Sequence, residues 1–294
     1  MRFAAVGSRT TSSGSHTDGQ VAESTGPLAQ GCLEPLQKAL WTILTFIGTR
    51  RLVPLLPRQY RETIFYFQTE QPVVALTIDD GLVRGGDPAT CWAAKVSSLL
   101  AEHNAHATFF VCSKYLTGVE EAAADLVAAG HELGNHMHED LHNHYWKLSE
   151  DAFAAELHRT TTAIEGIKGM GKGTVRWFRA PQGMLSSTMS LVVAKQGLRH
   201  ALGDAYADDW AMKHSTRFVS RTMLKQAQCG SICIVHMPQR GFREHTFESL
   251  SLLLDGLTAQ GIKCVTLSTM DAFVRQIDAQ AKTQLASETE SDLI

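Results

Sequence analysis

Two adjacent carboxylates, Asp79 and Asp80, directly follow the apolar run VVALTI at residues 73–78. Neighbouring like charges are costly to ionise together, and a divalent cation relieves their repulsion. One aspartate could then bind the cation while the other, pointing in a different direction, stays free as a base. Such a cation makes water more acidic and polarises a carbonyl group. Taken alone, the pair could equally be a helix cap or a solvated turn.

Histidines are the second feature that points to chemistry. Of the thirteen in the chain, five lie between His131 and His144, in the string HELGNHMHEDLHNH. An imidazole with another oxygen or nitrogen ligand three or four residues further on would complete a set of three protein ligands, which is the usual form of a catalytic metal site. The pattern therefore predicts that His136 and a nearby residue help to bind a cation.

The elements that must position these residues alternate regularly along the chain. Apolar or β-branched runs are separated by helical patterns, and the expected strands lie near residues 73, 107, 131, 176, 200, 232 and 264. Such alternation predicts a parallel sheet, because each crossover is helical and right-handed. Seven units over about 200 residues favour a barrel over an open sheet. The predicted fold class is therefore α/β, a seven-stranded (β/α) barrel.

The polar residues fall where such a barrel places its reactive groups. In parallel barrels, functional side chains gather at the carboxyl ends of the strands. Five of the expected strands end in polar or ionisable residues, which are Asp79-Asp80, Asn135-His136, Arg179 to Gly183, Asp208-Asp209-Trp210 and His236. We therefore expect these residues to meet at one edge of the sheet.

At these positions the chain resembles the NodB-homology polysaccharide deacetylases. The similar segments occur in the family's order over residues 73–270, and they read VVALTIDDG, HATFFV, GHELGNHMHED, WFRAPQG, LGDAYADDW and GSICIVHM. The resemblance implies a distorted barrel, more open than the eight-stranded kind. It also implies a metal-dependent hydrolase that removes acetyl groups from N-acetylglucosamine polymers or acetylated xylan.

Catalytic roles follow from the resemblance. Asp79 would be the general base that takes a proton from the attacking water, and Arg179 would hold it in orientation. His236 would be the general acid that protonates the leaving group. Asp209 would keep that histidine charged and in position.

The resemblance also implies the metal ligands Asp80 and His136. The family usually has a second histidine four residues after the first, and this chain has Asp140 there. Zinc is the cation expected first, although replacing imidazole by carboxylate favours manganese or magnesium. Three histidines remain alternatives to Asp140 as the third ligand, namely His138, His142 and His144.

The expected substrate-binding residues are Pro181, Gln182, Trp210 and Ile234. Trp210 and Ile234 would form walls around the acetyl methyl group. The backbone N–H near Gln182 would help to stabilise the oxyanion. Gln182 stands where the family often has an aromatic residue, so a stacking surface for a sugar is lost.

The composition of the chain and of its segments predicts the domain boundaries and the class of partner. The 294 residues are 44% hydrophobic and carry a net charge of −3, which disfavours a nucleic-acid-binding surface. We expect a disordered segment at 1–30, an extension at 31–72, the catalytic barrel at 73–278 and a loose tail at 279–294. The extension would pack on the barrel or, through residues 33–56, make weak contact with a membrane surface. The sequence does not indicate a cellular compartment.

The sequence therefore predicts a hydrolase that acts on carbon–nitrogen bonds other than peptide bonds, with an acetylated carbohydrate as substrate. Two alternatives remain. The first is a weakly active or inactive protein of the NodB fold that binds a glycan or a partner protein. The second is a hydrolase of small amides built on the same fold.

Overall fold

The computed structural model describes residues 27–141 and 144–291. Residues 1–26, which hold most of the segment expected to be disordered, lie outside the described residues, as does His142. Helix α1 begins at Pro27, so residues 27–30 are helical rather than disordered. Proline suits the first position of a helix, because its missing N–H would have no partner there.

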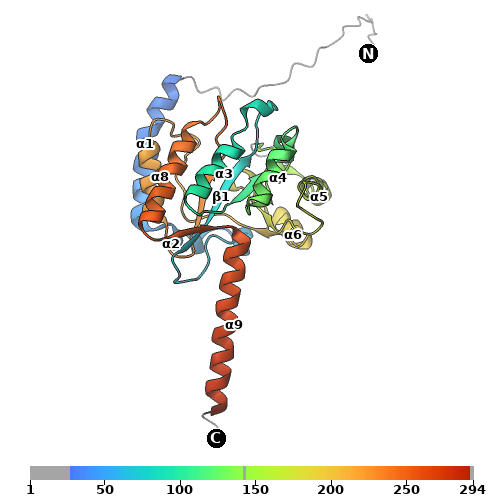
Figure 1. Cartoon of the computed structure of the whole chain (residues 1–294), viewed down its shortest axis with the longest axis vertical. Helices are drawn as coiled ribbons and strands as arrows, with labels where there is room; N and C mark the ends of the chain where they lie inside the picture. The colour runs from blue at the N-terminus through green and yellow to red at the C-terminus, as the bar shows by residue number, and fades with distance from the viewer. Residues whose placement is uncertain (1–26, 142–143, 292–294) are drawn as a thin grey trace, which may run out of the picture.

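A parallel sheet of seven strands forms the centre of the molecule (Figure 1). The strands are β1 (Val73–Gly81), β2 (Thr108–Val111), β3 (Glu132–Asn135), β4 (Trp177–Phe178), β5 (Arg199–His200), β6 (Ile232–His236) and β7 (Lys263–Val265). Their order is β5-β4-β3-β2-β1-β6, and β7 pairs with the start of β1. The sheet curls into a half-barrel with helices outside it, which confirms the predicted fold class.

The barrel is open between its two edge strands. Among the described residues, no continuous ladder joins β5 to β6; instead, residues 64–67 of the extension lie between them. The backbone N–H of Ile64 donates to His200 O over 3.0 Å, and the N–H of Phe67 donates to Gly230 O over 2.8 Å. Part of the extension is therefore built into the barrel wall.

Helices cover the outside of the sheet, and caps fix several of their starts. They are α3 (Ala93–Glu102), α4 (Glu120–Ala128), α5 (Glu150–Glu165), α6 (Ser187–Lys195), α7 (Thr216–Gln226) and α8 (His245–Ala259). Ser149 and Ser186 accept hydrogen bonds from backbone N–H groups in the first turns of α5 and α6. Such caps satisfy donors that have no partner within the helix. Short 3-10 turns lie at Val53–Leu55, Arg58–Tyr60, Pro88–Thr90, Ser113–Leu116, Tyr145–Lys147 and Pro181–Gly183.

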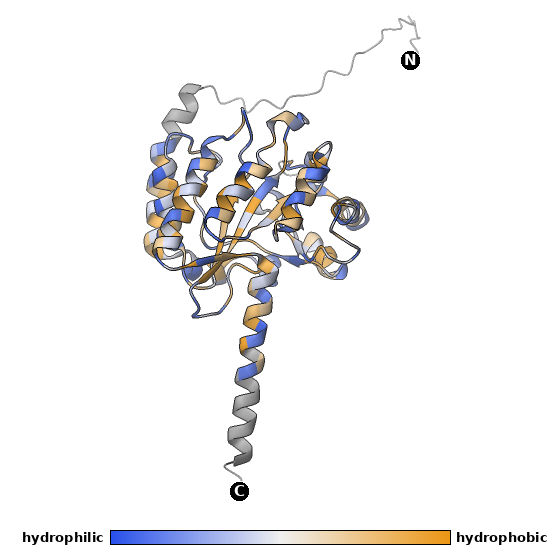
Figure 2. Ribbon diagram, viewed as in Figure 1, coloured by the Kyte–Doolittle hydropathy of each residue, from blue (hydrophilic) through white to orange (hydrophobic). Residues whose placement is uncertain are grey.

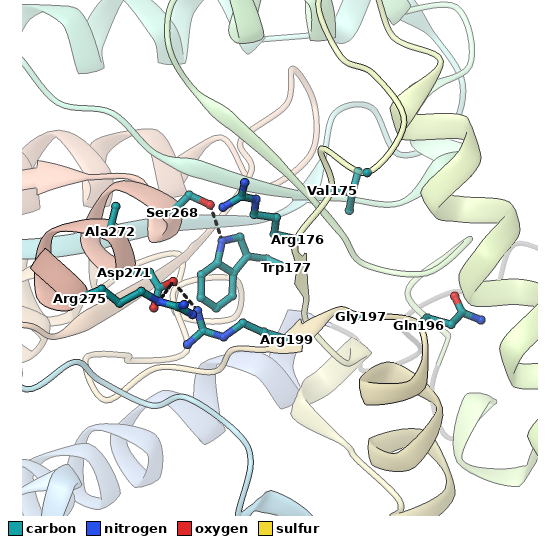
Figure 3. Close-up of a pocket in the computed structure, with 11 residues that line it drawn as sticks. Val175, Arg176, Trp177, Gln196, Gly197, Arg199, Ser268, Asp271, Ala272 and Arg275 are labelled. Carbon is teal, nitrogen blue, oxygen red and sulfur yellow. Dashed lines mark hydrogen bonds and ion pairs between the residues drawn. The ribbon is translucent and has the colours of Figure 1, made fainter. Parts of the chain in front are cut away.

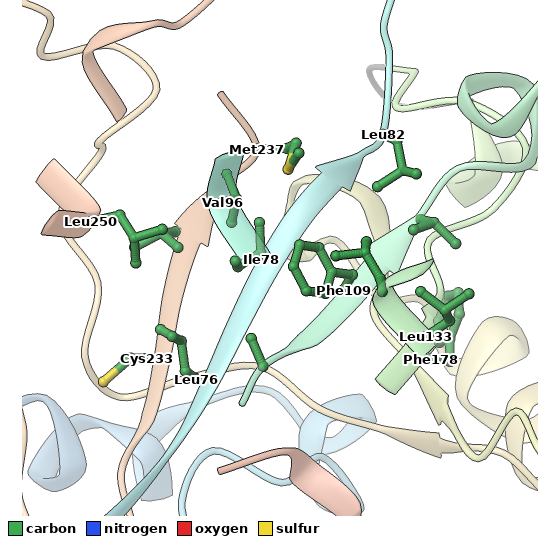
Figure 4. Packing of buried hydrophobic residues seen from close by; sticks show 14 of the residues in the cluster. Leu76, Ile78, Leu82, Val96, Phe109, Leu133, Phe178, Cys233, Met237 and Leu250 are labelled. Carbon is green, nitrogen blue, oxygen red and sulfur yellow. The ribbon is translucent and has the colours of Figure 1, made fainter. Parts of the chain in front are cut away.

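The main core lies between the sheet and its helices (Figure 4). Leu76 and Ile78 of β1 are fully buried, and Phe109 of β2 packs in the same cluster. Val96 of α3 and Leu250 of α8 close this cluster from the helical layer. A strand buried on both faces reads as a continuous apolar run, as VVALTI does, and it holds the following Asp79 and Asp80 at a fixed edge.

The extension consists of α1 (Pro27–Ile47), α2 (Thr49–Leu52) and the turns that follow. Helix α1 lies against α7 on the outside of the barrel. None of the described helices is both long and apolar enough to span a bilayer.

The chain ends in α9 (Leu267–Ser291), which projects away from the barrel (Figure 1). Residues 279–291 of the expected loose tail are helical, because α9 continues to Ser291. The segment AQAKTQLASETES contains neither glycine nor proline and is rich in good helix formers. This composition is compatible with the continued helix.

Candidate active site

The predicted site residues meet at the carboxyl edge of the sheet. Asp79 of β1 pairs in register with His236 of β6, and Asn135 of β3 pairs with Phe178 of β4. His136 and Arg179 directly follow these last two strand residues. Parallel register thus brings together groups that are far apart along the chain.

Asp79 is fixed by a buried arginine. Arg179 Nη1 donates to Asp79 Oδ1 over 2.6 Å and to Thr77 Oγ1 over 2.7 Å. Its Nε donates to Ala201 O over 2.9 Å, and the guanidinium is 1% exposed. Because the guanidinium of Arg179 is buried and hydrogen-bonded at several atoms, it holds the Asp79 carboxylate in one orientation before any substrate arrives.

Asp80 turns away from Asp79 because its backbone is left-handed, with φ of 61°. This conformation is costly for a residue with a Cβ and is found where function requires it. Ligand atoms of Asp80, His136 and Asp140 lie within 4.8 Å of one another, and we call these three residues the cation cluster. His136 Nδ1 donates to Arg179 O over 2.8 Å, which leaves Nε2 facing Asp80 Oδ1 at 3.4 Å.

The cation cluster carries strong electrostatic coupling. Burial alone would raise the pKa of Asp80, but the nearby imidazole of His136 and the charge of Arg243 hold that pKa well below its usual value. Burial would lower the pKa of His136, yet the adjacent Asp80 carboxylate and the other surrounding carboxylates raise it to about 9. Burial and the charge of Asp80 raise the pKa of Asp140. The pocket therefore favours positive charge at its centre.

The residues of the cluster fit a divalent cation. Oδ1 of Asp80 and Oδ1 of Asp140 are buried and have no hydrogen-bond partner among the described residues. A buried acceptor without a partner is expensive, and a cation satisfies it. Two carboxylates and one imidazole are donors that zinc and manganese accept.

His236 is held by both oxygens of one carboxylate. Its Nδ1 lies 2.7 Å from Asp209 Oδ1, and its backbone N–H donates to Asp209 Oδ2 over 2.7 Å. Burial by itself would lower the pKa of His236, but the charge and hydrogen bond of fully buried Asp209 raise it. The arrangement favours a protonated imidazole whose Nε2 is directed away from Asp209.

The expected substrate-binding residues lie around this edge. Ile234 and Pro181 are buried, whereas Trp210 is 38% exposed and its Nε1 donates to Tyr206 Oη over 2.9 Å. Gln182 is exposed and lies in a 3-10 turn with a left-handed φ of 56°. Their contacts with a substrate, including the oxyanion role of the Gln182 N–H, stay predictions.

Comparison with known proteins agrees with this geometry. The sequence profile of the polysaccharide deacetylase family matches residues 67–201. The chain matches the polysaccharide deacetylase family. The match includes Asp79, Asp80, His136 and Arg179, and it confirms the predicted resemblance to this family and the hydrolase class.

Relatives and solved structures extend the match. A chitooligosaccharide deacetylase of Azorhizobium caulinodans is 28% identical over 65% of this chain and 90% of its own length. The peptidoglycan deacetylase of Bacillus subtilis shares the fold, with a TM-score of 0.61, 24% identity and coverage of 74% of this chain and 99% of that one. A family pseudoenzyme of Bacillus anthracis also shares the fold, with a TM-score of 0.59 at 22% identity, covering 71% of this chain and 68% of that one.

The described histidines that were alternatives to Asp140 as third ligand have other partners. His138 Nδ1 lies 2.9 Å from Ser113 Oγ, and the ring of His144 packs against Tyr145. The left-handed Met137, with φ of 65°, redirects the chain between His136 and His138. His142 lies outside the described residues. Among the residues that the structure describes, the third member of the cation cluster is therefore Asp140.

Arg243 is the site residue that the sequence analysis missed. Its Nη1 donates to Asp80 Oδ2 over 2.6 Å, and it lies in the loop between β6 and α8. The string GFREH has no periodicity, so its only sequence signal is that it follows a strand whose end carries a site residue. Arg243 supplies positive charge to a cluster that holds two carboxylates, those of Asp80 and Asp140.

A separate groove of about 430 Å³ lies by the starts of β4 and β5, at the opposite edge of the sheet (Figure 3). Arg199 stacks on Trp177 there, and both Arg199 and Arg275 pair with Asp271 of α9. Its lining holds none of the predicted site residues. The groove is therefore not part of the candidate active site.

Proposed function

We propose that the protein is a metal-dependent carbohydrate deacetylase that hydrolyses the N-acetyl groups of amino sugars, or O-acetyl groups, by attack of water. The observation that carries this proposal is the placement of two hydrogen-bonded pairs, Asp79–Arg179 and Asp209–His236, at the same sheet edge as the cation cluster. A base, an acid and a cation site are the parts that acyl transfer to water requires.

The residues of the cation cluster would hold a divalent ion. When bound, the ion polarises the acetyl carbonyl and makes water more acidic. Asp79 accepts a proton from the attacking water, because the hydrogen bond from Arg179 holds its carboxylate in place. Its neighbour Asp80 belongs to the cation cluster, and Asp80 Oδ1 has no hydrogen-bond partner among the described residues.

His236 supplies the proton that the leaving group needs. Asp209 faces Nδ1, so Nε2 is the atom that donates. The leaving nitrogen of an amide must be protonated before the C–N bond breaks at neutral pH. Asp209 also accepts a hydrogen bond from the backbone N–H of His236, so one carboxylate holds both the ring and the strand that carries it.

The substrate class rests on the relatives and on the chemistry of the site. The Azorhizobium relative is a chitooligosaccharide deacetylase, which supports an N-acetylglucosamine oligomer as substrate. Zinc is the cation expected for this family, while the carboxylate of Asp140 favours manganese or magnesium.

The test is acetate release from N-acetylglucosamine oligomers and acetylated xylan, with zinc, manganese or magnesium added. Asp79→Asn and His236→Ala should each lower kcat at least 100-fold with the fold intact. Asp271→Asn and His103→Ala are matched controls, because they remove an aspartate and a histidine that form ion pairs outside the site. Equal losses in the controls, or no release by the wild type, would contradict the proposal.

One observation favours a second candidate, a glycan-binding protein without turnover. The Arg243 guanidinium occupies one oxygen of Asp80 in the cation cluster. Tight binding of the oligomers with no acetate under any cation would select this function. Turnover of small amides but not of oligomers would instead select a small-amide hydrolase.

A further inference from the structure

Helix α1 exposes an apolar face on the outside of the molecule. At 100° per residue, positions 36, 40, 43 and 47 share one side of a helix and position 46 borders it. We call these residues the outer stripe; their exposed fractions are Leu36 69%, Leu40 50%, Ile43 56%, Phe46 90% and Ile47 39%. Figure 2 shows hydrophobic residues on the described part of α1, which lies at the margin of the barrel.

The opposite side of α1 docks on the barrel largely through polar contacts. Trp41 Nε1 donates to Asp208 Oδ2 over 3.0 Å, and Ser215 Oγ donates to Glu34 Oε2 over 2.7 Å. One turn further on, Gln226 Nε2 donates to Thr45 Oγ1 over 2.9 Å. A helix on the surface of a soluble protein normally buries its apolar side and exposes its polar side. Helix α1 largely reverses this order, although Trp41 and Leu44 are half-buried.

The segment that carries the outer stripe is positively charged. Residues 35–61 contain five Lys or Arg residues and no Asp or Glu, although the whole chain carries a net charge of −3. Arg50 pairs with Asp204, while Arg51, Arg58 and Arg61 are exposed. The next turn adds two more exposed apolar side chains, Leu55 and Leu56.

We propose that residues 35–61 bind the surface of an anionic lipid bilayer, with the outer stripe at the level of the headgroups and the exposed arginines against lipid phosphates. Amphipathic helices with basic flanks bind such interfaces without crossing them. A second copy of this chain fits the face less well, because a two-fold contact would bring the same cationic segment against itself.

Flotation of the full chain with lipid vesicles tests the proposal. The protein should float with vesicles of equal parts phosphatidylcholine and phosphatidylglycerol, and bind at least tenfold more weakly to pure phosphatidylcholine or in high salt. The double variant Ile43→Ser, Phe46→Ser should bind at least tenfold more weakly at an unchanged Tm, because both side chains are exposed. The control Leu191→Ser alters an equally exposed leucine, 49% exposed on α6, and should bind like the wild type.

A second variant separates charge from apolar insertion. The triple change Arg51→Gln, Arg58→Gln, Arg61→Gln should remove the preference for anionic vesicles. Failure of the wild type to float, unchanged binding of the double variant, or a wild-type dimer that the double variant loses would each overturn the proposal. The assay uses neither metal nor glycan, so its outcome is independent of the deacetylase test.

Discussion

Arg243 Nη1 lies 2.6 Å from Oδ2 of Asp80, on a carboxylate whose other oxygen is buried without a hydrogen-bond partner among the described residues. The guanidinium of Arg243 and the proposed cation would therefore both bind the carboxylate of Asp80. The contact lowers the repulsion between Asp80 and Asp140 when no cation is bound, and it opposes a cation that arrives.

Replacing Arg243 by methionine should therefore tighten divalent-cation binding at least tenfold, about 1.4 kcal/mol. Calorimetric titration with manganese and zinc measures the dissociation constants. The control Arg240→Met removes an exposed arginine of the same loop and should change nothing. Weaker or unchanged binding in Arg243→Met would show that the arginine does not compete with the cation.

A second prediction concerns the choice of cation. Asp140→His should raise the preference for zinc over manganese at least tenfold, because imidazole is a softer ligand than carboxylate. Competition titrations with the two ions give the ratio directly. Glu139→His changes the neighbouring residue, which pairs with Lys114 outside the cluster, and should leave the ratio as it is. An unchanged ratio in Asp140→His would remove Asp140 from the ligand set.

The third prediction follows from the raised pKa of His236. A general acid must be protonated, so activity falls on the alkaline side as the pH passes the pKa of this histidine. Asp209→Asn removes the charge that raises the pKa, and it should move the alkaline limb of kcat to lower pH by about one unit or more. The control Asp208→Asn changes the adjacent aspartate, which binds Trp41, and should not move the limb. A limb that stays in place in both variants would assign it to another group.

The fourth prediction concerns stability in acid. Burial, followed by the charges of Arg179 and His136, lowers the pKa of His200 to about 3 from an ordinary value of 6.5. Between these values the unfolded chain binds a proton that the folded chain does not, so the free energy of unfolding decreases as the pH falls. This histidine should account for a loss of about 2 kcal/mol between pH 7 and pH 5.

Urea unfolding at the two pH values measures this loss in the wild type and in His200→Gln, where it should shrink by that amount. His103→Gln, which changes a histidine beside Thr258 on the outside of the barrel, is the control. An equal pH dependence in wild type and His200→Gln would mean that the pKa of His200 is the same in the folded and the unfolded chain.

The sequence predicted the strands and their polar ends well, for a physical reason. VVALTI is apolar because β1 is buried on both faces, so the first polar pair after it had to stand at the sheet edge. His236 and Arg179 were found by the same rule. Parallel register then determines that these ends converge, whatever the loops do.

Irregular segments were less predictable. Spacing alone did not separate Asp140 from three nearby histidines, because the direction of that loop depends on the left-handed Met137. Arg243 reaches Asp80 from a loop with no periodic pattern. The exposure of the apolar face of α1 could not be predicted from the sequence either, because the spacing of apolar residues is the same in a buried and in an exposed helix face.

Hydrolysis of acetyl groups can be followed by mass spectrometry of an N-acetylglucosamine oligomer incubated with the cation-saturated protein in oxygen-18 water. We expect that acetyl groups are lost from the oligomer and that the released acetate carries the heavy oxygen, with both signals absent in Asp79→Asn. An intact oligomer after incubation with folded, cation-bound wild type would contradict it.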